Sequence, residues 1–372
     1  MKAVAVVPRQ QQVQLLEHEA PSIAAPTEVK LRMLDVGVCG TDRELCSFQY
    51  GTPPPGSEYL VIGHEALGEV VEVGPAVARV KPGDLAVLMV RRPCPHERCV
   101  ACRSDRQDFC FTDDYTERGI KEAHGYMTEF VVDDEQYMQP VPPELRDVGV
   151  LVEPLTIAEK ALAQVWQVQE RLPWACAAVP GEEPGYCHTA VVLGAGPVGL
   201  LGAATLAAGG FQTYVYSRGA VTSAKAALVT AIDATYICSE TNSVESLAEQ
   251  VGDIDLVYEA TGAAGISFEV MRVLGPNGVF VLTGVPGRDS AAKFDAALIM
   301  RNLVLKNQVV FGTVNAGREA FQAAIRDLGI FMQRWPDAIR SLITARHPIA
   351  AYRDVLLSNP GGIKHVIAMD GE

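Results

Sequence analysis

Four cysteines gather in one short segment, and their spacing is typical of a metal site. The chain has nine cysteines, an odd number. A disulfide framework is expected in shorter secreted chains, whereas clustered cysteines in a cytosolic enzyme more often bind zinc. The sequence therefore predicts a zinc site made by Cys94, Cys99, Cys102 and Cys110. Three cysteines without such spacing are expected to be inert thiols: Cys176, Cys187 and Cys238.

A glycine-rich motif directly follows the apolar run Thr189–Leu193 and opens a helical stretch. In a G-x-G-x-x-G motif the first glycine permits a tight turn, the second lets the backbone approach a pyrophosphate, and the third allows close packing of helix on strand. The helix N-terminus then offers amide groups and a positive dipole to the phosphates. This context predicts a dinucleotide-binding loop with five contact residues: Gly194, Gly196, Pro197, Val198 and Gly199.

The end of the next predicted strand favours NADP, with NAD possible. An acidic side chain there would bind a ribose hydroxyl, but the segment Tyr214–Gly219 contains none. Ser217 can hydrogen-bond a 2′-phosphate and Arg218 can neutralise it. The alternative is that Arg218 is only a solvated charge at a strand end. We also assign Thr261 and Thr283 to the cofactor site.

Two patterns of elements must position these residues. Short β runs broken by Gly and Pro turns favour a small β-barrel in the N-terminal part: Lys2–Val7, Glu28–Val36, Leu67–Val73, Asp84–Met89 and Gly125–Val132. A connecting helix is expected at Ile157–Gln169 from its helical spacing of apolar residues.

From Thr189 onward, strands and helices alternate, which predicts a doubly wound parallel sheet with right-handed crossovers. The expected strands are Thr189–Leu193, Thr213–Tyr216, Tyr236–Cys238, Asp255–Glu259 and Val279–Thr283. The expected helices are Gly199–Ala208, Ser223–Thr230, Ser243–Gln250, Gly265–Val273 and, near the C-terminus, Arg318–Leu328.

Length and charge limit the classes of function. A chain of 372 residues exceeds the usual range of one hydrophobic core, so two domains are expected. The net charge of −14, without a dense Lys/Arg run, disfavours nucleic acid and anionic membranes as partners. No apolar run is long enough for a signal peptide or a membrane span. We therefore expect a soluble cytoplasmic protein.

Two short motifs near the N-terminus add a mixed set of metal donors: Gly37–Asp42 and Gly63–Val70. With the dinucleotide motif in the same chain order, they resemble the zinc-dependent medium-chain alcohol dehydrogenases over essentially the whole chain. The resemblance implies a catalytic zinc bound by Cys39, His64 and Glu153, with Glu65 as a neighbouring or exchanging ligand. Thr41 corresponds to the hydroxyl residue that starts the family's proton relay.

The donor types agree with that assignment. A thiolate, an imidazole and a carboxylate leave one position open on zinc, which is typical of a catalytic site. A substrate hydroxyl at that position becomes more acidic, and its alkoxide can expel hydride toward a nicotinamide. The resemblance also implies three parts: a GroES-like β-barrel catalytic domain at residues 1–164, a Rossmann domain at 165–314, and a segment at 315–372 that returns to the catalytic domain.

The four-cysteine segment, residues 94–110, resembles the structural zinc lobe of the same family. Four thiolates close a tetrahedral site with no open position, so its expected role is to hold a loop. Its first interval is two residues longer than the common C-x-x-C, which makes His96 a conceivable substitute for Cys94.

A narrower resemblance is to the glucose dehydrogenase branch, based on Val90–Cys94, Gln107–Cys110, Glu117–Ile120 and Phe311–Ala316. In that branch, a glutamate and an asparagine contact sugar hydroxyls. The matching positions in this chain are Glu117 and Asn315, so the resemblance implies the same role for them. At two positions where that branch has polar residues, this chain has Val90 and Ile157. The resemblance therefore does not identify which sugar is the substrate.

Each of these two substrate residues has an alternative role. Glu117 could pair with Arg118 or Lys121 at the surface, and Asn315 could cap the helix that begins near Arg318.

The leading prediction is an aldose 1-dehydrogenase that oxidises the anomeric hydroxyl of a sugar such as D-glucose to the lactone with NADP. Its substrate contacts are expected to be Thr41, Glu117, Glu153 and Asn315. A polyol, threonine or simple alcohol dehydrogenase is the alternative, because the fold leaves the substrate open. A catalytically silent NADP-binding protein is a third. Members of the family are homodimers or homotetramers, often joined through a strand such as Leu303–Gly312.

Overall fold

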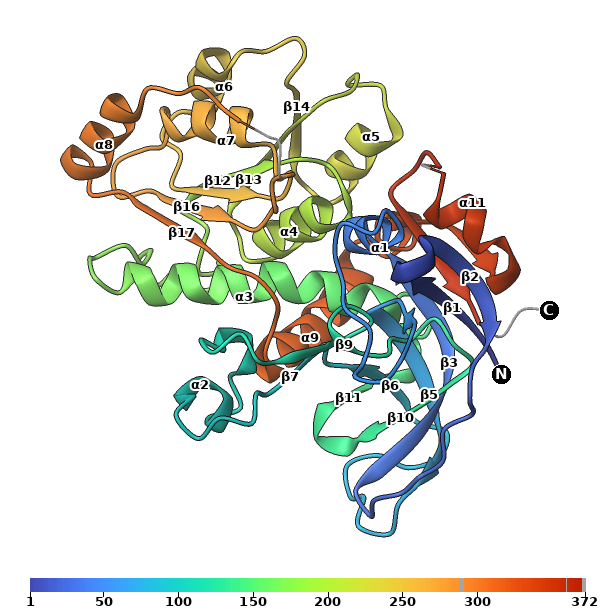
Figure 1. The fold of residues 1–372 in the computed structure, drawn as a ribbon. Helices are drawn as coiled ribbons and strands as arrows, with labels where there is room; N and C mark the ends of the chain where they lie inside the picture. Colours follow the sequence, from blue (N-terminus) through green and yellow to red (C-terminus); the bar gives the residue numbers. More distant parts are fainter. Residues whose placement is uncertain (288–290, 359, 370–372) are drawn as a thin grey trace. The chain divides into compact units, whose positions relative to one another are not determined.

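A computed structural model describes residues 1–287, 291–358 and 360–369 of the chain. The chain divides into two units, which are described separately (Figure 1). The first unit comprises Met1–Thr156, Asn315–Gly329 and Ile339–Glu372, and the second comprises Ile157–Val314 and Ile330–Ala338.

The first unit consists mainly of antiparallel β-structure. Its largest sheet has the strand order β11-β6-β5-β3-β19-β18, and β10 pairs with β3. These strands are β3 (Glu28–Val38), β5 (Glu65–Val73), β6 (Leu85–Leu88), β10 (Phe130–Asp134), β11 (Met138–Val141), β18 (Ile343–Pro348) and β19 (Lys364–Ala368). Two smaller sheets have the orders β2-β1-β4 and β7-β8-β9. Their strands are β1 (Lys2–Val7), β2 (Gln12–Glu17), β4 (Leu60–Val61), β7 (Arg91–Arg92), β8 (Thr116–Arg118) and β9 (Glu122–Ala123).

Alternating apolar residues of these strands form the core of the first unit. Val29, Leu31 and Met33 of β3 are buried in it, together with Ala66 and Val70 of β5. The helices of this unit are short apart from α9: α1 (Gly40–Cys46), α2 (Val100–Arg103), α9 (Arg318–Arg334), α10 (Pro336–Leu342) and α11 (Tyr352–Leu356). The divided helices α9 and α10 also contribute residues to the second unit.

The second unit contains a six-stranded parallel sheet with the order β14-β13-β12-β15-β16-β17. The strands are β12 (Thr189–Leu193), β13 (Gln212–Ser217), β14 (Thr235–Cys238), β15 (Leu256–Glu259), β16 (Val279–Leu282) and β17 (Val309–Gly312). The order reverses between β12 and β15, and ligands of such sheets bind where the carboxyl ends of the strands diverge. The predicted doubly wound sheet is confirmed.

Helices cover both faces of this sheet (Figure 1). They are α3 (Val152–Gln169), α4 (Pro197–Ala208), α5 (Ala224–Ala231), α6 (Val244–Val251), α7 (Ala264–Met271) and α8 (Ala296–Leu305). Leu247 of α6, Val270 of α7 and Ile299 of α8 pack in one cluster with the strand residues Val191 and Val257. Within the described residues, no helix has the length and apolar character needed to cross a bilayer.

Several element boundaries differ from the sequence predictions. The strand predicted at Gly125–Val132 begins only at Phe130. The predicted strand Leu303–Gly312 is wrong in its first part, because α8 continues to Leu305 and β17 begins at Val309. The helix predicted to end at Leu328 runs through Gly329 to Arg334, since a single glycine lowers helix stability without ending the helix.

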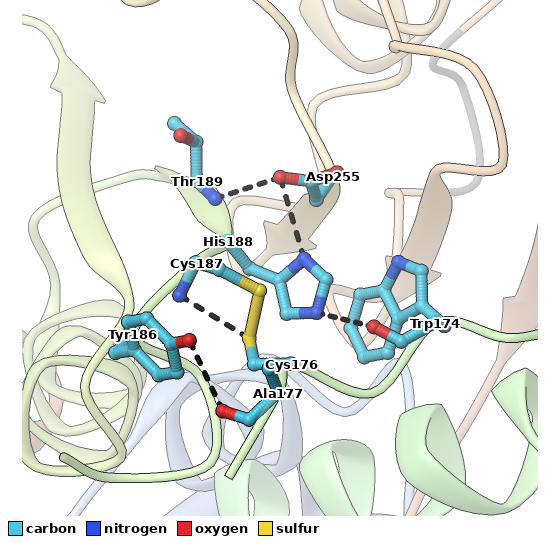
Figure 2. Close-up of a disulfide and its surroundings, with 8 residues drawn as sticks. All are labelled: Trp174, Cys176, Ala177, Tyr186, Cys187, His188, Thr189 and Asp255. Carbon is cyan, nitrogen blue, oxygen red and sulfur yellow. Dashed lines mark hydrogen bonds and ion pairs between the residues drawn. A yellow bond between two sulfur atoms is a disulfide. The ribbon is translucent and has the colours of Figure 1, made fainter. Parts of the chain in front are cut away.

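The prediction of free thiols is wrong for Cys176 and Cys187, which form a disulfide (Figure 2). The link between α3 and β12 folds back on itself here, because the His188 ring stacks on Trp174 with 3.9 Å between centroids. His188 Nε2 also lies 2.8 Å from the Trp174 carbonyl oxygen. The stacked pair flanks the two cysteines, since Trp174 precedes Cys176 and His188 follows Cys187. Cys238 is a free, buried thiol as predicted.

Candidate active site and cofactor site

The mixed metal donors meet because β3 and β5 are antiparallel neighbours. Gly37 of β3 is paired with Glu65 of β5, so the residues just beyond these strand ends lie next to each other. Cys39 Sγ lies 3.1 Å from His64 Nε2. Ligand atoms of Cys39, His64 and Glu65 all lie within 4.8 Å of one another.

Asp42 orients the histidine of this cluster. Its fully buried carboxylate accepts a hydrogen bond of 2.9 Å from the Cys39 backbone N–H. Its other oxygen lies 3.5 Å from His64 Nδ1, on the ring side away from Cys39. A carboxylate on Nδ1 leaves Nε2 to act as a metal ligand. Sequence reasoning did not assign Asp42 a role, although it is the third residue after Cys39.

Lys364 of β19 neutralises Glu65. The Lys364 side chain is almost completely buried, forms an ion pair with the Glu65 carboxylate, and donates to the Val38 carbonyl at 3.1 Å. Burial alone would lower the pKa of Lys364, but the charges of Glu65 and Cys39 raise it. A Cβ atom at Gly37 would lie 2.2 Å from the Glu65 carboxylate, so this buried pair requires glycine at that position.

Glu153 and Thr41 lie at the first turns of two helices. Glu153 is in the first turn of α3, and Thr41 follows the N-cap residue Cys39 of α1. Glu153 does not belong to the group of ligand atoms within 4.8 Å, which contains Glu65 in its place. Its removal from water raises the pKa of Glu153 to about 7; His64 opposes this shift and Glu65 adds to it. Glu153 therefore lies within electrostatic reach of the cluster.

The electrostatics of this cluster fit a bound cation. Burial alone would lower the pKa of His64, but the charges of Cys39 and Asp42 raise it well above its ordinary value. A site that draws a proton onto a buried imidazole stabilises positive charge. The sulfur, nitrogen and carboxylate donors suit zinc in particular.

The four-cysteine segment forms a second and separate cluster. Sulfur atoms of Cys94, Cys99, Cys102 and Cys110 lie within 4.8 Å of one another. Burial opposes ionisation there, but the backbone N–H groups of Cys102 and Phe111 lower the pKa of Cys99 to about 6. The alternative ligand His96 faces away to Asp114, 2.7 Å from its Nε2. The fit is therefore to four thiolates.

Glu117 and Asn315 meet although they are far apart in the sequence. Asn315 Nδ2 donates to Glu117 Oε1 at 2.8 Å. Glu117 is buried and pairs with Arg91, whereas Arg118 pairs with Asp133. Asn315 adopts a left-handed backbone conformation. Its Oδ1 accepts a hydrogen bond from the backbone N–H of Ala316, which precedes helix α9, and so it does not cap that helix. Neither alternative role proposed from the sequence is observed.

A close backbone contact brings the turn after Glu117 against the metal cluster. Gly119 has a φ of +77°, and a Cβ atom there would lie 2.3 Å from the Gly63 carbonyl oxygen, next to His64. Charged groups of both the Glu117 pair and the metal cluster influence the phenol of Tyr50. Burial and then the charge of Glu117 raise the pKa of Tyr50, while the charges of Arg91 and His64 lower it. The Glu117–Asn315 pair and the metal donors therefore lie close to each other.

The glycine loop lines a cavity of about 780 Å³ in the second unit. Gly194, Gly196, Ser217, Arg218 and Thr261 are among its lining residues. Lys225 also lines it and adds a cation that sequence reasoning missed. Pro197, Val198 and Gly199 lie in the first turn of α4, with Pro197 at its first position.

Hydrogen bonds hold the turn that carries Ser217 and Arg218. Ser217 Oγ accepts from the backbone N–H of Ala195 at 3.2 Å and so connects this turn to the glycine loop. Gly219 N donates to the Glu240 carboxylate at 2.9 Å. The Tyr236 hydroxyl lies 2.9 Å from the carbonyl oxygens of Arg218 and Gly219.

The two predicted threonines differ in position. Thr261 lines the cavity and donates its backbone N–H and its hydroxyl to the buried Glu259 carboxylate, at 2.6 and 2.5 Å. Thr283 donates to the Glu259 carbonyl at 2.7 Å and is not among the described residues that line the cavity.

Known families match both parts of the sequence. Residues 25–143 match the family described as "Alcohol dehydrogenase GroES-like domain". Residues 146–369 match the family described as "Glucose dehydrogenase C-terminus". The chain belongs to the glucose dehydrogenase family. The predicted resemblance and the predicted fold class, a GroES-like domain with a Rossmann domain, are confirmed.

Named relatives agree over their full length. The glucose 1-dehydrogenase of Methanocella arvoryzae is 37% identical over 368 residues, which is 99% of each chain. The enzyme of the same name from Thermoproteus tenax is also 37% identical over 368 residues, again 99% of each chain. These matches place the chain in the glucose dehydrogenase family from end to end.

Solved structures extend the comparison to the fold. Haloferax mediterranei glucose dehydrogenase, in complex with NADP, Zn and gluconolactone, has a TM-score of 0.87 at 32% identity and covers 100% of each chain. Galactitol-1-phosphate dehydrogenase from Escherichia coli has a TM-score of 0.76 at 21% identity and covers 99% of this chain, which shows the fold alone.

Proposed function

We propose that this protein is a zinc-dependent aldose 1-dehydrogenase that oxidises the anomeric hydroxyl of D-glucose or a similar aldose with NADP. Membership of the glucose dehydrogenase family supports this reaction. The complex of the Haloferax relative with NADP, Zn and gluconolactone supports the product and the cofactors. The overall change is aldose plus NADP⁺ to lactone plus NADPH and a proton.

The observation that carries the proposal is the hydrogen-bonded pair of buried Glu117 and half-buried Asn315 near the metal cluster. A carboxylate accepts hydrogen bonds from sugar hydroxyls, and an amide both donates and accepts. A site for an aliphatic alcohol would instead be lined mainly by apolar side chains. The pair therefore favours an aldose over a simple alcohol.

The residues have separate roles in this reaction. Cys39, His64 and Glu153, with Glu65 adjacent, are the proposed zinc ligands, and a bound zinc would make a coordinated hydroxyl more acidic. Thr41 would receive the hydroxyl proton and pass it toward solvent. Glu117 and Asn315 would hold the remaining hydroxyls, so that the anomeric hydrogen can leave as hydride to the nicotinamide.

NADP selection would rest on Ser217, Arg218 and Lys225. Charge-assisted hydrogen bonds to a 2′-phosphate contribute about 1.5–3 kcal/mol. Arg218→Ala should therefore change the NADP-to-NAD ratio of kcat/KM by roughly 10- to 150-fold. An unchanged ratio would make Arg218 a solvated charge, and Lys225→Ala would then test the other cation.

A substrate panel tests the function. D-glucose, D-galactose, D-xylose and their deoxy analogues are compared with ethanol and sorbitol, with reduction of NADP and NAD followed at 340 nm. We expect an aldose to have the highest kcat/KM and its deoxy analogue to be poorer. If ethanol or sorbitol is the best substrate, the polyol or simple alcohol dehydrogenase alternative replaces the aldose reaction. If nothing is oxidised, the silent NADP-binding alternative stands.

Two further properties belong to the proposal. We expect a homodimer or homotetramer, supported by the sheet-edge position of β17 and by exposed Met300, Val304 and Leu305 on α8 just before it. Light scattering at two concentrations measures this state. We also expect a cytoplasmic location, where a disulfide such as Cys176–Cys187 is uncommon. Cell fractionation, with thiol labelling of the recovered protein, tests both points.

A further inference from the structure

Among the described residues, hydrogen-bond donors contact only one of the two carboxylate oxygens of Glu117. Its Oε1 accepts from Arg91 Nε at 3.0 Å and from Asn315 Nδ2 at 2.8 Å, and Arg91 Nη2 lies 3.0 Å from the same atom. In the described part of the chain, no group donates a hydrogen bond to Oε2. Oε2 is also absent from the set of fully buried polar atoms that lack a hydrogen-bond partner, so it is accessible from outside the protein. The second oxygen is therefore open to a ligand.

Arg91 is itself held in a single orientation. It lies directly opposite Glu117 in the β7–β8 ladder. Its guanidinium stacks on the Tyr115 ring with 3.7 Å to the centroid, and Nη1 donates to the Asp108 carbonyl at 3.4 Å. Arg91 and Glu117 are both more than nine-tenths buried. A buried carboxylate needs such a paired and hydrogen-bonded cation to remain charged without a large penalty.

The cysteine-rich segment contacts the two parts of the chain that donate hydrogen bonds to Glu117, which are Arg91 and the segment of Asn315. Asp108, whose carbonyl accepts from Arg91, lies in the turn Asp105–Asp108 between the third and fourth cysteines. A Cβ atom at Gly317 would lie 2.9 Å from the Asp108 carboxylate, so the chain after Asn315 passes directly over this turn. Arg318 Nε donates to Asp105 at 2.7 Å. One turn of the four-cysteine segment thus contacts Arg91 and also the segment that carries Asn315.

We propose that Arg91, supported by the Asp105–Asp108 turn, is a positioning residue for the sugar. It pairs with Oε1 of the Glu117 carboxylate and aims Oε2 at a substrate hydroxyl, while the metal donors bind the reacting end. This inference rests on the proposed function. The four-cysteine segment would then influence sugar binding as well as stability, because its turn sets the position of Arg91.

Five proteins test this inference: wild type, Arg91→Met, Arg91→Lys, Glu117→Gln and the double variant Arg91→Met/Glu117→Gln. Arg92→Met is the matched control. Arg92 is the next residue, has a side chain that is only 13% exposed, pairs with Asp133 at 2.5 Å, and stacks on Tyr137 at 4.0 Å. It therefore loses an ion pair and a ring contact of the same kind, away from Glu117. Steady-state kinetics with D-glucose and with NADP, calorimetric D-glucose binding, zinc content and Tm are measured for each.

Arg91→Met should lower kcat/KM for D-glucose by about 10- to 100-fold, mostly through KM, because a charge-assisted hydrogen bond to substrate is misplaced. The KM for NADP and the zinc content should stay within about twofold. The effects of Arg91→Met and Glu117→Gln should not add in the double variant, because both act on one hydrogen bond. Arg91→Lys should restore part of the sugar affinity. Where Arg91→Met is too unstable to assay, the charge-conserving Arg91→Lys alone decides.

The outcomes separate this inference from the proposed function. If wild type oxidises no aldose, the function fails and the inference fails with it. If wild type is active but Arg91→Met changes the D-glucose KM no more than Arg92→Met does, Arg91 is a structural residue only. Where Arg91→Met cannot be assayed, a D-glucose KM of Arg91→Lys equal to that of wild type has the same meaning. Additive effects in the double variant would likewise overturn the role through Glu117.

Discussion

The two cysteine-containing clusters of the first unit are built in opposite ways. The four thiols of the cysteine-rich segment come from one short stretch of chain and belong to one residue type. The donors of the other cluster, Cys39, His64 and Glu65, come from the adjoining ends of β3 and β5, and they differ in type. Buried charged residues contact the members of this second cluster directly: Asp42 faces His64, and Lys364 pairs with Glu65.

This difference teaches where catalysis can occur. Four equivalent thiolates satisfy a tetrahedral metal completely, so they leave no position for a substrate. Three donors of mixed type would leave one position on zinc open to a substrate, and neighbouring groups contact the histidine and the carboxylate of this cluster. Variants of the two clusters should therefore differ in what they remove, either turnover or stability.

The largest effect is expected from Cys39→Ser. It should lower kcat by about 1,000-fold or more, because a lost metal contribution of several kcal/mol corresponds to one decade per about 1.4 kcal/mol. Cys46→Ala on the same helix is the control. Burial and then the charge of Asp42 raise the pKa of Cys46 to about 12, so it is a neutral thiol and not a ligand. A Cys39→Ser protein with wild-type kcat would remove this cluster from catalysis.

A smaller loss is expected from Asp42→Asn, which keeps the shape of the side chain but not its charge. Zinc affinity should fall by about 10- to 100-fold, as is usual when a carboxylate behind a ligating histidine is changed. Competition with a chelator measures it. Glu44→Gln, an exposed position on the same helix, should leave the affinity unchanged. Equal affinities of all three proteins would mean that Asp42 does not orient His64.

Cys102→Ser should act on stability and leave most of kcat intact. Loss of one metal from the segment should lower Tm by about 5–10 °C, since 1 kcal/mol corresponds to roughly 2–4 °C in domains of this size. Zinc per chain should fall from two to one, by metal analysis. If wild type and the variant both contain one zinc, the four-cysteine segment binds no metal and the contrast between the clusters is lost.

The smallest effect separates the candidate ligands of that segment. His96→Ala removes only a partly exposed pair with Asp114, and such pairs contribute about 0–1 kcal/mol. Tm and zinc content should therefore be nearly those of wild type, while Cys94→Ser should behave like Cys102→Ser. The reverse result would make His96 the fourth ligand.

The sequence predicted local patterns better than long-range ones. The four-cysteine cluster and the glycine loop each lie within one segment, so residue type and spacing were enough to find them. The strand Thr189–Leu193 was predicted with the observed bounds because it is a short apolar run before that loop. Thr283 shows the limit, since a strand-end threonine can face either the cavity or the backbone of its neighbour.

Long-range partners could not be predicted from spacing. Lys364 lies hundreds of residues after Glu65 and reaches it only because β19 pairs with β3 beside β5. Arg91 was noticed as part of a motif, but its pairing with Glu117 depends on the β7–β8 register. The disulfide was missed because the stacking of His188 on Trp174, which closes that loop, has no signature in the cysteine spacing.

The disulfide has a consequence for limited proteolysis. Every residue from Ala177 to Pro184, including Glu182 and Glu183, is exposed, and exposed loops are preferred sites of cleavage. A glutamate-specific protease that cuts between Cys176 and Cys187 would leave the two fragments joined through sulfur. The nicked chain should then migrate as one band on a denaturing gel without reductant and as two bands after reduction. The cleavage divides the chain just before β12, the first strand of the parallel sheet.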